Sequence, residues 1–317
     1  MAVIAIDLTA NKINTALFKT DGELVESKKR PLGELRATQV GRFLCRQIDE
    51  FIKKAAIHHL EVRAIGISVP GIYYESTGVV WAPNIPGWRN YPLIDDLKKY
   101  PFPVRVMSDR CCHILGEHWK GAARGCKNAI YYSVGSGIYA GIMIDGQILR
   151  GNSNIAGAIG WMSLDSSFDP VYRKCGYLEY YASASGIPAR ARDLAKAAEG
   201  YQGPLLLEET NVQDVFNAYK LEDPVAEAVL DQAIRYWGAS LANLISVFNP
   251  SKIILGGSVF GPASQFKHRM YEEAAKWAQP ISMQDVTFEL SQLGNQAGLV
   301  GAGRLALITV EEMQTRA

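Results

Sequence analysis

The sequence predicts an α/β protein with two lobes, because one strand–turn–strand unit occurs twice in the chain. The first copy begins at Ile4 and the second at Ile130, and in each an apolar strand enters a small-residue turn before a second strand returns. An Asp-Gly pair then opens a third strand, which is the strongest short-range signal for a hairpin. Two such turns could face each other across a central cleft and hold a polyphosphate, so a nucleotide-using protein is the first hypothesis.

The bulk composition fits a soluble globular protein, and 317 residues suit two domains of ordinary size. With 33 basic and 32 acidic residues, the formal charge of +1 gives no sign of a nucleic-acid or membrane partner. The apolar runs are far shorter than the ~20 residues that span a bilayer, and the N-terminus does not resemble a signal peptide. The five cysteines form no regular ladder, so we expect reduced thiols in a cytoplasmic protein.

The first lobe is expected to alternate strands with helices. Apolar residues recur at three- and four-residue spacing between Val40 and Ala55, which predicts an amphipathic helix. A second helix is expected from Asp109 to about Lys120, directly after a short strand. The expected strands of this lobe cover residues 3–6, 13–18, 24–28, 64–69 and 104–107.

Glycines at 121–125 mark the expected hinge into the second lobe. After its hairpin unit, this lobe should contain a long helix at 224–248, capped by Asp223, and a strand at 252–255. A last helix that is rich in small residues is expected to allow close packing. The expected domains are an N-terminal lobe of residues 1–120, completed by the C-terminal helix at about 296–317, and a C-terminal lobe of residues 121–295.

Two glycine turns of the second lobe are candidates for contact with a nucleotide. Gly135-Ser136-Gly137 lies between two strands, where glycine lets backbone N–H groups approach a phosphate closely. Such a turn is usually an ordinary hairpin turn. Its position inside a repeated unit favours the interpretation as a phosphate-binding turn. Gly256-Gly257 ends a buried strand, where it could seat an adenine or ribose or simply let the strand leave the sheet.

Asp109 stands at the end of one expected strand and the start of a helix. An acidic residue in that position is most often a helix N-cap. The carboxyl end of a strand is also where α/β folds place reactive groups. A carboxylate there could accept a proton from a hydroxyl that attacks phosphorus, and both interpretations remain open on these grounds.

Cys111-Cys112-His113 looks like a metal-binding cluster. Adjacent residues of a helix point in different directions, so these three cannot converge on one ion. The other cysteines and histidines add no zinc-ligand spacing. We therefore expect no metal at this cluster.

Eight short motifs follow one another along almost the whole chain. They are Asp7 with Lys12-Ile13 and Asp21-Gly22; Gly66–Gly71 with Gly78 and Ala82–Asn84; Ser108-Asp109 with Gly116-Glu117 and Gly121; Gly135–Gly137 with Asp145-Gly146 and Gly151; Ala156–Trp161; Gly176–Glu179 with Tyr181–Ser183; Leu255–Gly257; and Gln296–Ala302. No single motif is diagnostic, but their order resembles that of the repressor–ORF–kinase (ROK) family of sugar kinases. The resemblance implies an actin-like (ribonuclease H-like) duplicated fold with a central cleft.

The resemblance also implies ATP-dependent phosphorylation of a carbohydrate hydroxyl, by analogy at C6 of a hexose, with Asp109 as the general base. Mg²⁺ is expected near Asp7. The implied nucleotide-side residues are Asp7, Thr9, Asn11, Lys12, Gly135, Ser136, Gly137, Gly256 and Gly257. The implied sugar-side residues are Gly71, Asn84, Ser108, Asp109, Trp161 and Glu179. Self-association into a homodimer or homotetramer is expected by family analogy alone.

The first phosphate turn departs from the family pattern. The family has Asp-x-Gly-Gly-Thr, whereas this chain has Asp7-Leu8-Thr9-Ala10-Asn11. The added Cβ atoms lie where backbone should approach phosphate, and any position that needs a positive φ would be strained. Thr9 and Asn11 keep polar side chains that could substitute.

The family's zinc and sugar motif is also altered. Its Gly-Glu-x-Gly-His becomes Gly157–Trp161, which removes the Glu and the His that hold the C1–C2 side of the sugar, and only Cys175 remains of its cysteine run. We expect no zinc, with Ile, Trp and Tyr side chains filling that space. Trp161 either stacks on a sugar face or serves as core filler. A sugar altered or substituted at C1 or C2 should fit better than free glucose.

A non-catalytic sugar sensor or scaffold is the alternative. The altered first turn favours it, whereas Asp109 and Glu179 count against it. Family repressors carry a DNA-binding segment before the first strand, and this chain starts at that strand, so we expect no direct DNA binding.

Overall fold

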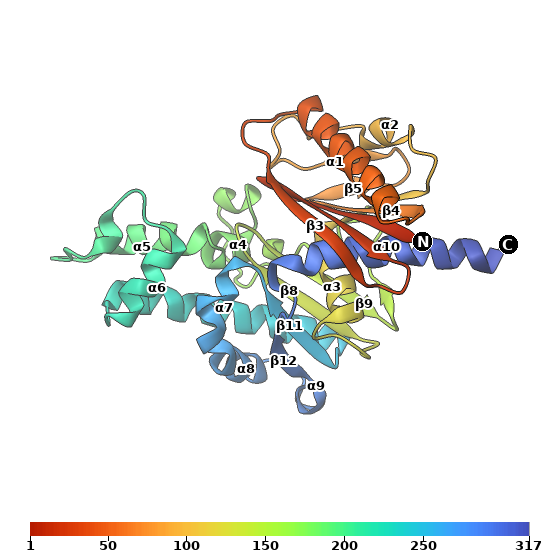
Figure 1. Cartoon of the computed structure of the whole chain (residues 1–317). Coiled ribbons are helices and arrows are strands. Elements are labelled where there is room, and N and C mark those ends of the chain that lie inside the picture. Colours follow the sequence, from red (N-terminus) through yellow and green to blue (C-terminus); the bar gives the residue numbers. More distant parts are fainter. Residues whose placement is uncertain (317) are drawn as a thin grey trace. The chain divides into compact units, whose positions relative to one another are not determined.

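The computed structural model describes residues 1–316, which divide into two compact units (Figure 1). Unit 1 comprises Met1–Gly125, Ile148–Ala156 and the described residues from Gln292 onward. Unit 2 comprises Cys126–Gln147 and Gly157–Ser291. The segment Ile148–Ala156 thus belongs to unit 1 although it follows the second hairpin unit, a feature that no local pattern had indicated.

A mixed five-stranded sheet forms the centre of unit 1. Its strand order is β3 (Leu24–Pro31), β2 (Lys12–Lys19), β1 (Ala2–Leu8), β4 (Val62–Val69) and β7 (Val104–Ser108). The first three strands are antiparallel, whereas β4 runs parallel to β1 and β7 runs parallel to β4. A small hairpin of β5 (Ile72–Tyr74) and β6 (Val79–Trp81) follows β4. The five strands expected for this lobe are therefore confirmed, each somewhat longer than expected.

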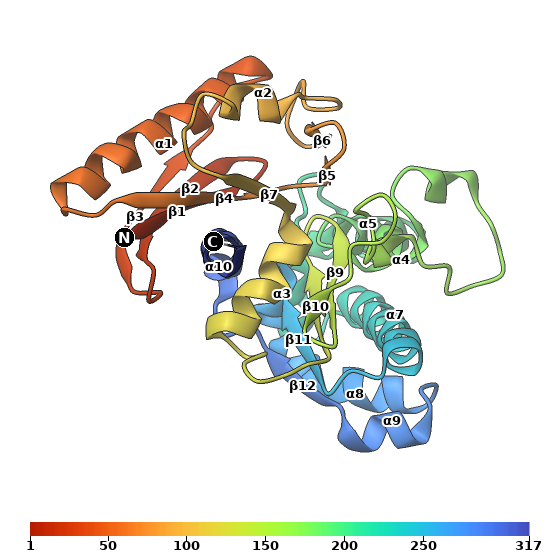
Figure 2. The same ribbon diagram turned by 90° about the vertical axis from the view of Figure 1, so that its right-hand side faces the viewer.

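Helices cover both faces of this sheet (Figure 2). α1 (Thr38–Ile57) lies on one face, and α3 (Asp109–Lys120) and α10 (Ala297–Arg316) lie on the other. Side chains of β1 alternate between the faces, so Ile4 and Ile6 join the core under α1, whereas Val3 and Ala5 join the core under α10. The short helix α2 (Leu93–Leu97) precedes β7.

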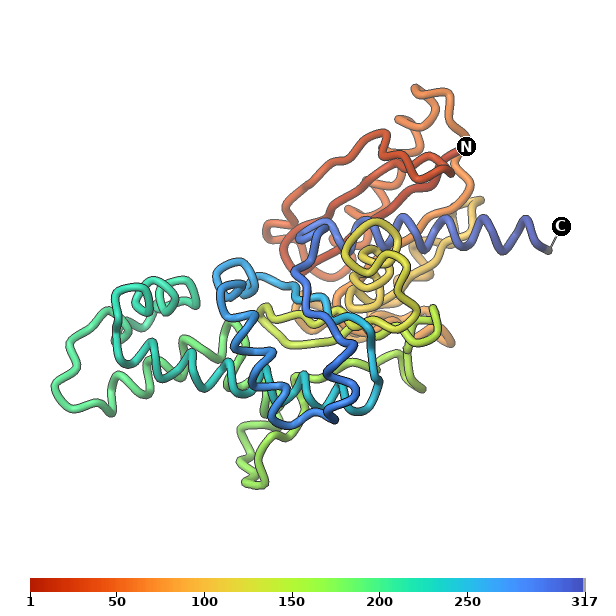
Figure 3. Tube along the Cα trace, turned by 90° about the horizontal axis from the view of Figure 1, so that it is seen from below, coloured from red at the N-terminus to blue at the C-terminus, as the bar shows by residue number. Residues whose placement is uncertain are grey.

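α10 packs closely against α3 and β4, as Figure 3 shows for α3. A Cβ atom on Gly116 would overlap the carbonyl oxygen of Ala297, and one on Gly301 would overlap that of Cys112. Gly66 of β4 is equally tight against α10. The small residues expected at the start of this helix therefore serve close backbone packing.

Unit 2 repeats the topology of unit 1. Its sheet has the order β10 (Gln147–Ile148), β9 (Ile138–Ile144), β8 (Ala129–Val134), β11 (Lys252–Gly256) and β12 (Thr287–Leu290). β8 and β9 are antiparallel, whereas β11 pairs parallel with both β8 and β12. Asp145 and Gly146 both have positive φ angles, which the tight turn before β10 uses. The predicted duplicated α/β fold is confirmed.

The helices of unit 2 agree well with the sequence where a cap defines them. α7 spans Pro224–Phe248, and the Asp223 side chain accepts hydrogen bonds from the amides of Val225 and Ala226, as predicted. The other helices are α4 (Tyr177–Ala182), α5 (Gly186–Ala197), α6 (Val212–Lys220), α8 (Lys267–Ala275) and α9 (Pro280–Asp285). No helix within residues 1–316 is long and apolar enough to cross a membrane.

Candidate active site

The carboxyl ends of three parallel strands bring the predicted residues of unit 1 together. The register pairs Asp7 of β1 with Ser68 of β4, and Val69 of β4 with Ser108 of β7. Asp7, the turn after β4 with Gly71, and Asp109 therefore lie at one edge of the sheet, where α/β folds commonly build their sites. Asn84 is exposed on the loop after β6.

Asp7 is a buried carboxylate held by two neutral donors. The Ser68 hydroxyl donates to Oδ1 at 2.9 Å, and the Asn14 side-chain amide donates to Oδ2 at 3.2 Å. Both partners are its register neighbours in β4 and β2. In the described chain no Lys, Arg or His forms an ion pair with Asp7, so its charge is available to a hard cation. Mg²⁺ binds through one or two carboxylates plus phosphates and waters, which fits this residue.

The first turn adopts an ordinary backbone despite its missing glycines. None of residues 8–12 has a positive φ angle, so the strain that a left-handed position would bring does not arise. The Thr9 amide donates to the Lys12 carbonyl at 2.9 Å, and the Thr9 hydroxyl lies 3.2 Å from both Asn11 Oδ1 and that same carbonyl. The Thr9 side chain therefore braces the turn, whereas Asn11 is exposed.

Asp109 is the first residue of α3, and Ser108 occupies the N-cap position without a side-chain cap bond. The N-cap interpretation of Asp109 is therefore wrong; its Oδ1 accepts a hydrogen bond from the next amide, that of Arg110, at 2.8 Å. Burial raises the pKa of Asp109, while His113 and Arg110 lower it and Asp7 raises it further. A carboxylate with a raised pKa is suited to accept a proton.

Ser108 is buried, and its contact with a sugar stays a prediction. Its side chain is 4% exposed, and its hydroxyl donates to Cys111 Sγ at 3.4 Å. Burial raises the pKa of the thiols of Cys111 and Cys112. Within the described residues, no group of three or more His, Cys, Asp or Glu side chains is placed to hold a metal ion.

Arg110 is a functional candidate that the sequence analysis missed. Its guanidinium is buried and donates to the carbonyl oxygens of Gly71, at 3.3 Å, and of Asn154. The Asn154 side chain donates in turn to the Tyr73 carbonyl at 3.0 Å. Arg110 therefore ties the turn after β4 and the segment Ile148–Ala156 to the helix that begins with Asp109. One indication of this role was present in the sequence: Arg110 is a charged residue directly after Asp109 in the first turn of the expected helix.

In unit 2 the turn Gly135–Gly137 has free amides at its tip. The Gly135 amide donates to the Gly137 carbonyl at 2.9 Å, and the Gly135 carbonyl accepts from Ala184 at 2.8 Å. Among residues 1–316, the amides of Ser136 and Gly137 have no acceptor, and Ser136 is exposed. These two N–H groups are available to an anion.

Glu179 of α4 lies against this turn. Its Oε2 accepts a hydrogen bond from the Ile138 amide at 2.9 Å. Cβ atoms on Gly137 and Gly160 would each lie 2.9 Å from the same oxygen, so both positions require glycine. Burial raises the pKa of Glu179, and the Ile138 amide lowers it. Its contact with a sugar stays a prediction.

The Gly256-Gly257 pair is explained at least in part by packing. Gly257 has a φ of 90°, and a Cβ there would overlap the Val134 carbonyl. A Cβ on Gly256 would overlap the Tyr131 ring. Both glycines lie beside the Gly135–Gly137 turn because β8 and β11 are paired, and their contact with a nucleotide stays a prediction.

Trp161 corrects one expectation about the altered zinc motif. Ile159 and Tyr177 are buried, at 4% and 7% exposure, but Trp161 is 56% exposed. The core-filler interpretation of Trp161 is therefore wrong. Its side chain is open to a ligand, because the 3₁₀ turn Ile159–Trp161 ends with the indole at the surface.

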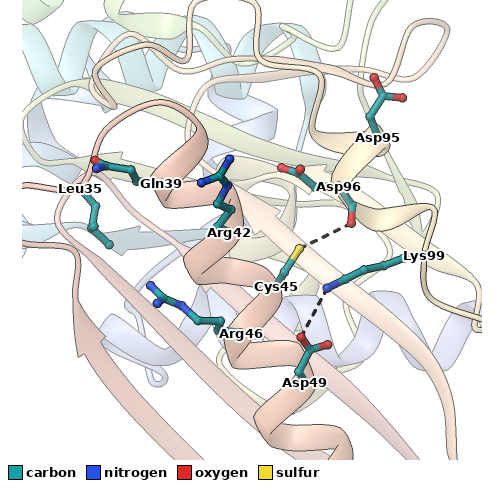
Figure 4. Close-up of a pocket in the computed structure, with 9 residues that line it drawn as sticks. All are labelled: Leu35, Gln39, Arg42, Cys45, Arg46, Asp49, Asp95, Asp96 and Lys99. Carbon is teal, nitrogen blue, oxygen red and sulfur yellow. Dashed lines mark hydrogen bonds and ion pairs between the residues drawn. The ribbon is translucent and has the colours of Figure 1, made fainter.

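A separate groove of about 720 Å³ lies in unit 1, and none of the predicted site residues lines it (Figure 4). Lys99 is paired with Asp49 across it, and the Cys45 thiol donates to the Asp96 carbonyl. Its lining combines three acidic with three basic side chains, most of them exposed. This balanced, solvated surface gives no reason to assign chemistry to the groove.

Comparison with known proteins gives one consistent result. The ROK family model matches residues 3–308. A glucokinase of Halalkalibacterium halodurans is 32% identical, over 95% of this chain and 94% of that protein. A xylose repressor of Caldicellulosiruptor bescii is 28% identical, over 95% of this chain and 76% of the repressor.

Solved structures agree. A ROK hexokinase from Thermus thermophilus is 28% identical with a TM-score of 0.81, covering 98% of this chain and 100% of that one. A ROK family glucokinase from Streptomyces griseus, in complex with glucose and AMPPNP, is 26% identical with a TM-score of 0.72, covering 96% and 99%. The chain therefore belongs to the ROK family and has its actin-like, duplicated α/β fold.

Proposed function

We propose that this protein is an ATP-dependent carbohydrate kinase with Asp109 as its general base. The observation that carries the proposal is the placement of Asp109: a partly exposed carboxylate of raised pKa at the carboxyl end of a parallel strand, on the sheet edge that also holds Asp7. The similarity of the chain to a glucokinase and to a ROK hexokinase, over nearly the whole length of each, supports phosphorylation of a sugar.

Asp109 would accept the proton of the attacking hydroxyl. The hydroxyl oxygen would then form a bond to the terminal phosphorus of ATP as the bond to the bridging oxygen breaks and ADP leaves. By family analogy the acceptor is the C6 hydroxyl of a hexose. Arg110 would hold the turn with Gly71 at a fixed position relative to Asp109, because its guanidinium donates to the Gly71 carbonyl.

Asp7 would hold the Mg²⁺ that accompanies ATP, since Ser68 and Asn14 fix both carboxylate oxygens and leave its charge unpaired. When bound, Mg²⁺ neutralises charge on the phosphates. The free amides of Ser136 and Gly137 would bind phosphate oxygens within unit 2, and Thr9, Asn11 and Lys12 would do so within unit 1. Gly256 and Gly257 would form the nucleoside side.

The sugar would be bound by Gly71, Asn84, Ser108, Trp161 and Glu179. Because Ala158 and Trp161 replace a polar pair, we propose a hexose altered or substituted at C1 or C2 as the substrate. A non-catalytic sugar sensor remains the second candidate, because a xylose repressor matches over the same stretch of this chain. The unstrained first turn favours the kinase. Self-association and a cytoplasmic location stay predictions.

The test is ADP release with Mg²⁺-ATP and a panel of hexoses, amino and N-acyl sugars, glycosides and polyols. A sugar-dependent signal should fall by orders of magnitude in Asp109→Asn and persist in Asp95→Asn, which changes an exposed carboxylate on α2. Circular dichroism should show that both variants are folded. If folded wild-type protein releases no ADP with any sugar of the panel, the kinase proposal is refuted and the sensor becomes the favoured function.

A further inference from the structure

The Gly135–Gly137 turn of unit 2 is held by the segment that joins α4 to α5. The Ala184 amide donates to the Gly135 carbonyl at 2.8 Å, and the Ser185 hydroxyl donates to the Ser136 carbonyl at 3.1 Å. Two successive carbonyl groups of the turn are therefore bound to two successive residues of that segment. The two serines are 49 positions apart in the chain, so the contact is one that only the tertiary structure creates.

These two contacts also fix the direction of the amides at the tip of the turn. The peptide units of the turn are trans, and a trans unit carries its C=O and its N–H on opposite sides. The Gly135 carbonyl shares a unit with the Ser136 amide, and the Ser136 carbonyl shares one with the Gly137 amide. Both amides, which have no acceptor within the described chain, therefore point away from the segment 184–185. Two adjacent amides so directed can donate to an anion.

The Ser185 side chain is not used as a helix cap. Ser185 occupies the N-cap position of α5, where a serine hydroxyl normally accepts a hydrogen bond from a helix amide. Within residues 1–316 it makes no such bond, and the Gly186 amide donates to the buried Ser183 hydroxyl instead, at 2.9 Å. Capping therefore does not explain the Ser185 hydroxyl, and its contact with the turn does.

The hydroxyl groups form a chain with one consistent direction. A serine hydroxyl has a single hydrogen to donate, and Ser185 gives its own to the Ser136 carbonyl, which can only accept. The oxygens of Ser183 and Ser185 are 3.1 Å apart, so Ser183 must be the donor in that bond. Because Ser183 is fully buried, the chain that ends at Ser136 begins at a fixed point of the core.

We propose that Ser185 is a positioning residue for phosphate binding. It holds the Ser136–Gly137 peptide unit so that the amide, and not the carbonyl, faces a phosphate oxygen of the nucleotide. Rotation of this unit would present a carbonyl oxygen to the anion, and holding it in advance avoids the cost of ordering it on binding. The next amide, that of Ile138, donates to Glu179 and is not available. The inference deepens the proposed function and rests on it in naming ATP as the ligand.

The first test is isothermal titration with Mg²⁺-AMPPNP in the absence of sugar. Ser185→Ala should bind it roughly fivefold more weakly than the wild type, the factor that corresponds to the usual net contribution of one neutral hydrogen bond. Ser185→Thr keeps a hydroxyl and should restore the affinity. Ser251→Ala is the matched control, because Ser251 is another exposed serine of unit 2 whose hydroxyl donates to a distant carbonyl, that of Asn128, at 2.9 Å. It should bind as the wild type does.

A second measurement follows the Gly137 amide directly by NMR. Labelling the serine carbonyl carbon with ¹³C and the glycine nitrogen with ¹⁵N selects the amides of Gly137 and Gly186, because Ser-Gly occurs in the chain only at 136–137 and 185–186. In Ser185→Ala the Gly186 signal is lost from this pair, which assigns the other to Gly137. Saturating AMPPNP should shift the Gly137 signal of the wild type, and should shift it less in Ser185→Ala.

The proposal is overturned if AMPPNP leaves the Gly137 signal of the wild type unmoved. It is also overturned if Ser185→Ala matches the wild type in both affinity and Gly137 shift, because Ser185 would then serve only the start of α5. ADP release separates this inference from the kinase. AMPPNP binding that weakens in Ser185→Ala, without ADP release with any sugar, supports the role of Ser185 and refutes the kinase. Sugar-dependent ADP release with an unchanged KM for ATP in Ser185→Ala overturns the role of Ser185 alone.

Discussion

Gly298 of α10 offers a test in which two known effects have opposite signs. Replacing a helical glycine by alanine usually stabilises a protein by up to about 1 kcal/mol. A Cβ at this position, however, would lie 2.6 Å from Asp7 Oδ1, closer than real Cβ atoms approach other atoms. Asp7 is buried and bonded to Ser68 and Asn14, so it cannot move without loosening those bonds. Overpacking of this kind costs about 1–3 kcal/mol, so we expect Gly298→Ala to destabilise the protein.

Urea denaturation of Gly298→Ala, Asp7→Ala and the double variant measures this coupling as a double-mutant cycle. If Asp7 is the obstacle, Gly298→Ala should destabilise the wild type and become neutral or stabilising once the Asp7 carboxylate is gone. Gly298→Ala should also weaken Mg²⁺-ATP binding, because it displaces the proposed metal ligand. A stabilising effect in the wild-type background would refute this account of the packing.

Three further predictions follow from single contacts. Burial raises the pKa of Asp109 above its ordinary 3.8, so the folded protein binds this proton more tightly than the unfolded chain does. The free energy of unfolding should therefore decrease as the pH rises through the folded-state pKa. Asp109→Asn should remove that part of the pH dependence from denaturation curves. Arg110→Met should lower the free energy of unfolding by about 2–4 kcal/mol, because charge-assisted hydrogen bonds, including that to the Gly71 carbonyl, are lost. It should also shift the acid limb of the pH–rate profile to higher pH, because Arg110 lowers the pKa of Asp109. An unshifted limb would leave Arg110 a purely structural role. Gly257→Ala should destabilise by at least about 1 kcal/mol, because alanine would be strained at a φ of 90° and would overlap the Val134 carbonyl, and thermal unfolding that matches the wild type would contradict this.

Local patterns predicted the elements that local forces define. α7 begins directly after its cap Asp223 and ends at Phe248, as predicted, and α1 follows the apolar spacing between Val40 and Ala55. The Asp145-Gly146 turn formed as expected, but the strand after it has only two residues, whereas its counterpart in unit 1 has eight. The chain leaves the sheet there, since Ile148–Ala156 belongs to unit 1. The spacing of apolar residues in the sequence gives no indication that this segment belongs to the other unit.

The candidate site was predicted only in outline. Asp109 stood out because it follows an expected strand, and Asp7 because the family resemblance implied it. The interpretation of Asp109 as an N-cap was wrong by one residue, a difference that backbone geometry decides. The sequence left open whether Trp161 stacks on a ligand or fills the core, and in the structure Trp161 is 56% exposed while Ile159 and Tyr177 are buried.

The sequence by itself determined the two hairpin units, the capped helices and the order of motifs that identifies the family, because these depend on residues close together in the chain. Only the tertiary structure decided what holds the reactive groups. Ser68 reaches Asp7 across 61 positions and Asn154 reaches Arg110 across 44, through strand register in one case and a returning segment in the other. Hydrogen bonds depend on distance in space, and distance in space is fixed by how the elements pack rather than by the pattern within any one of them.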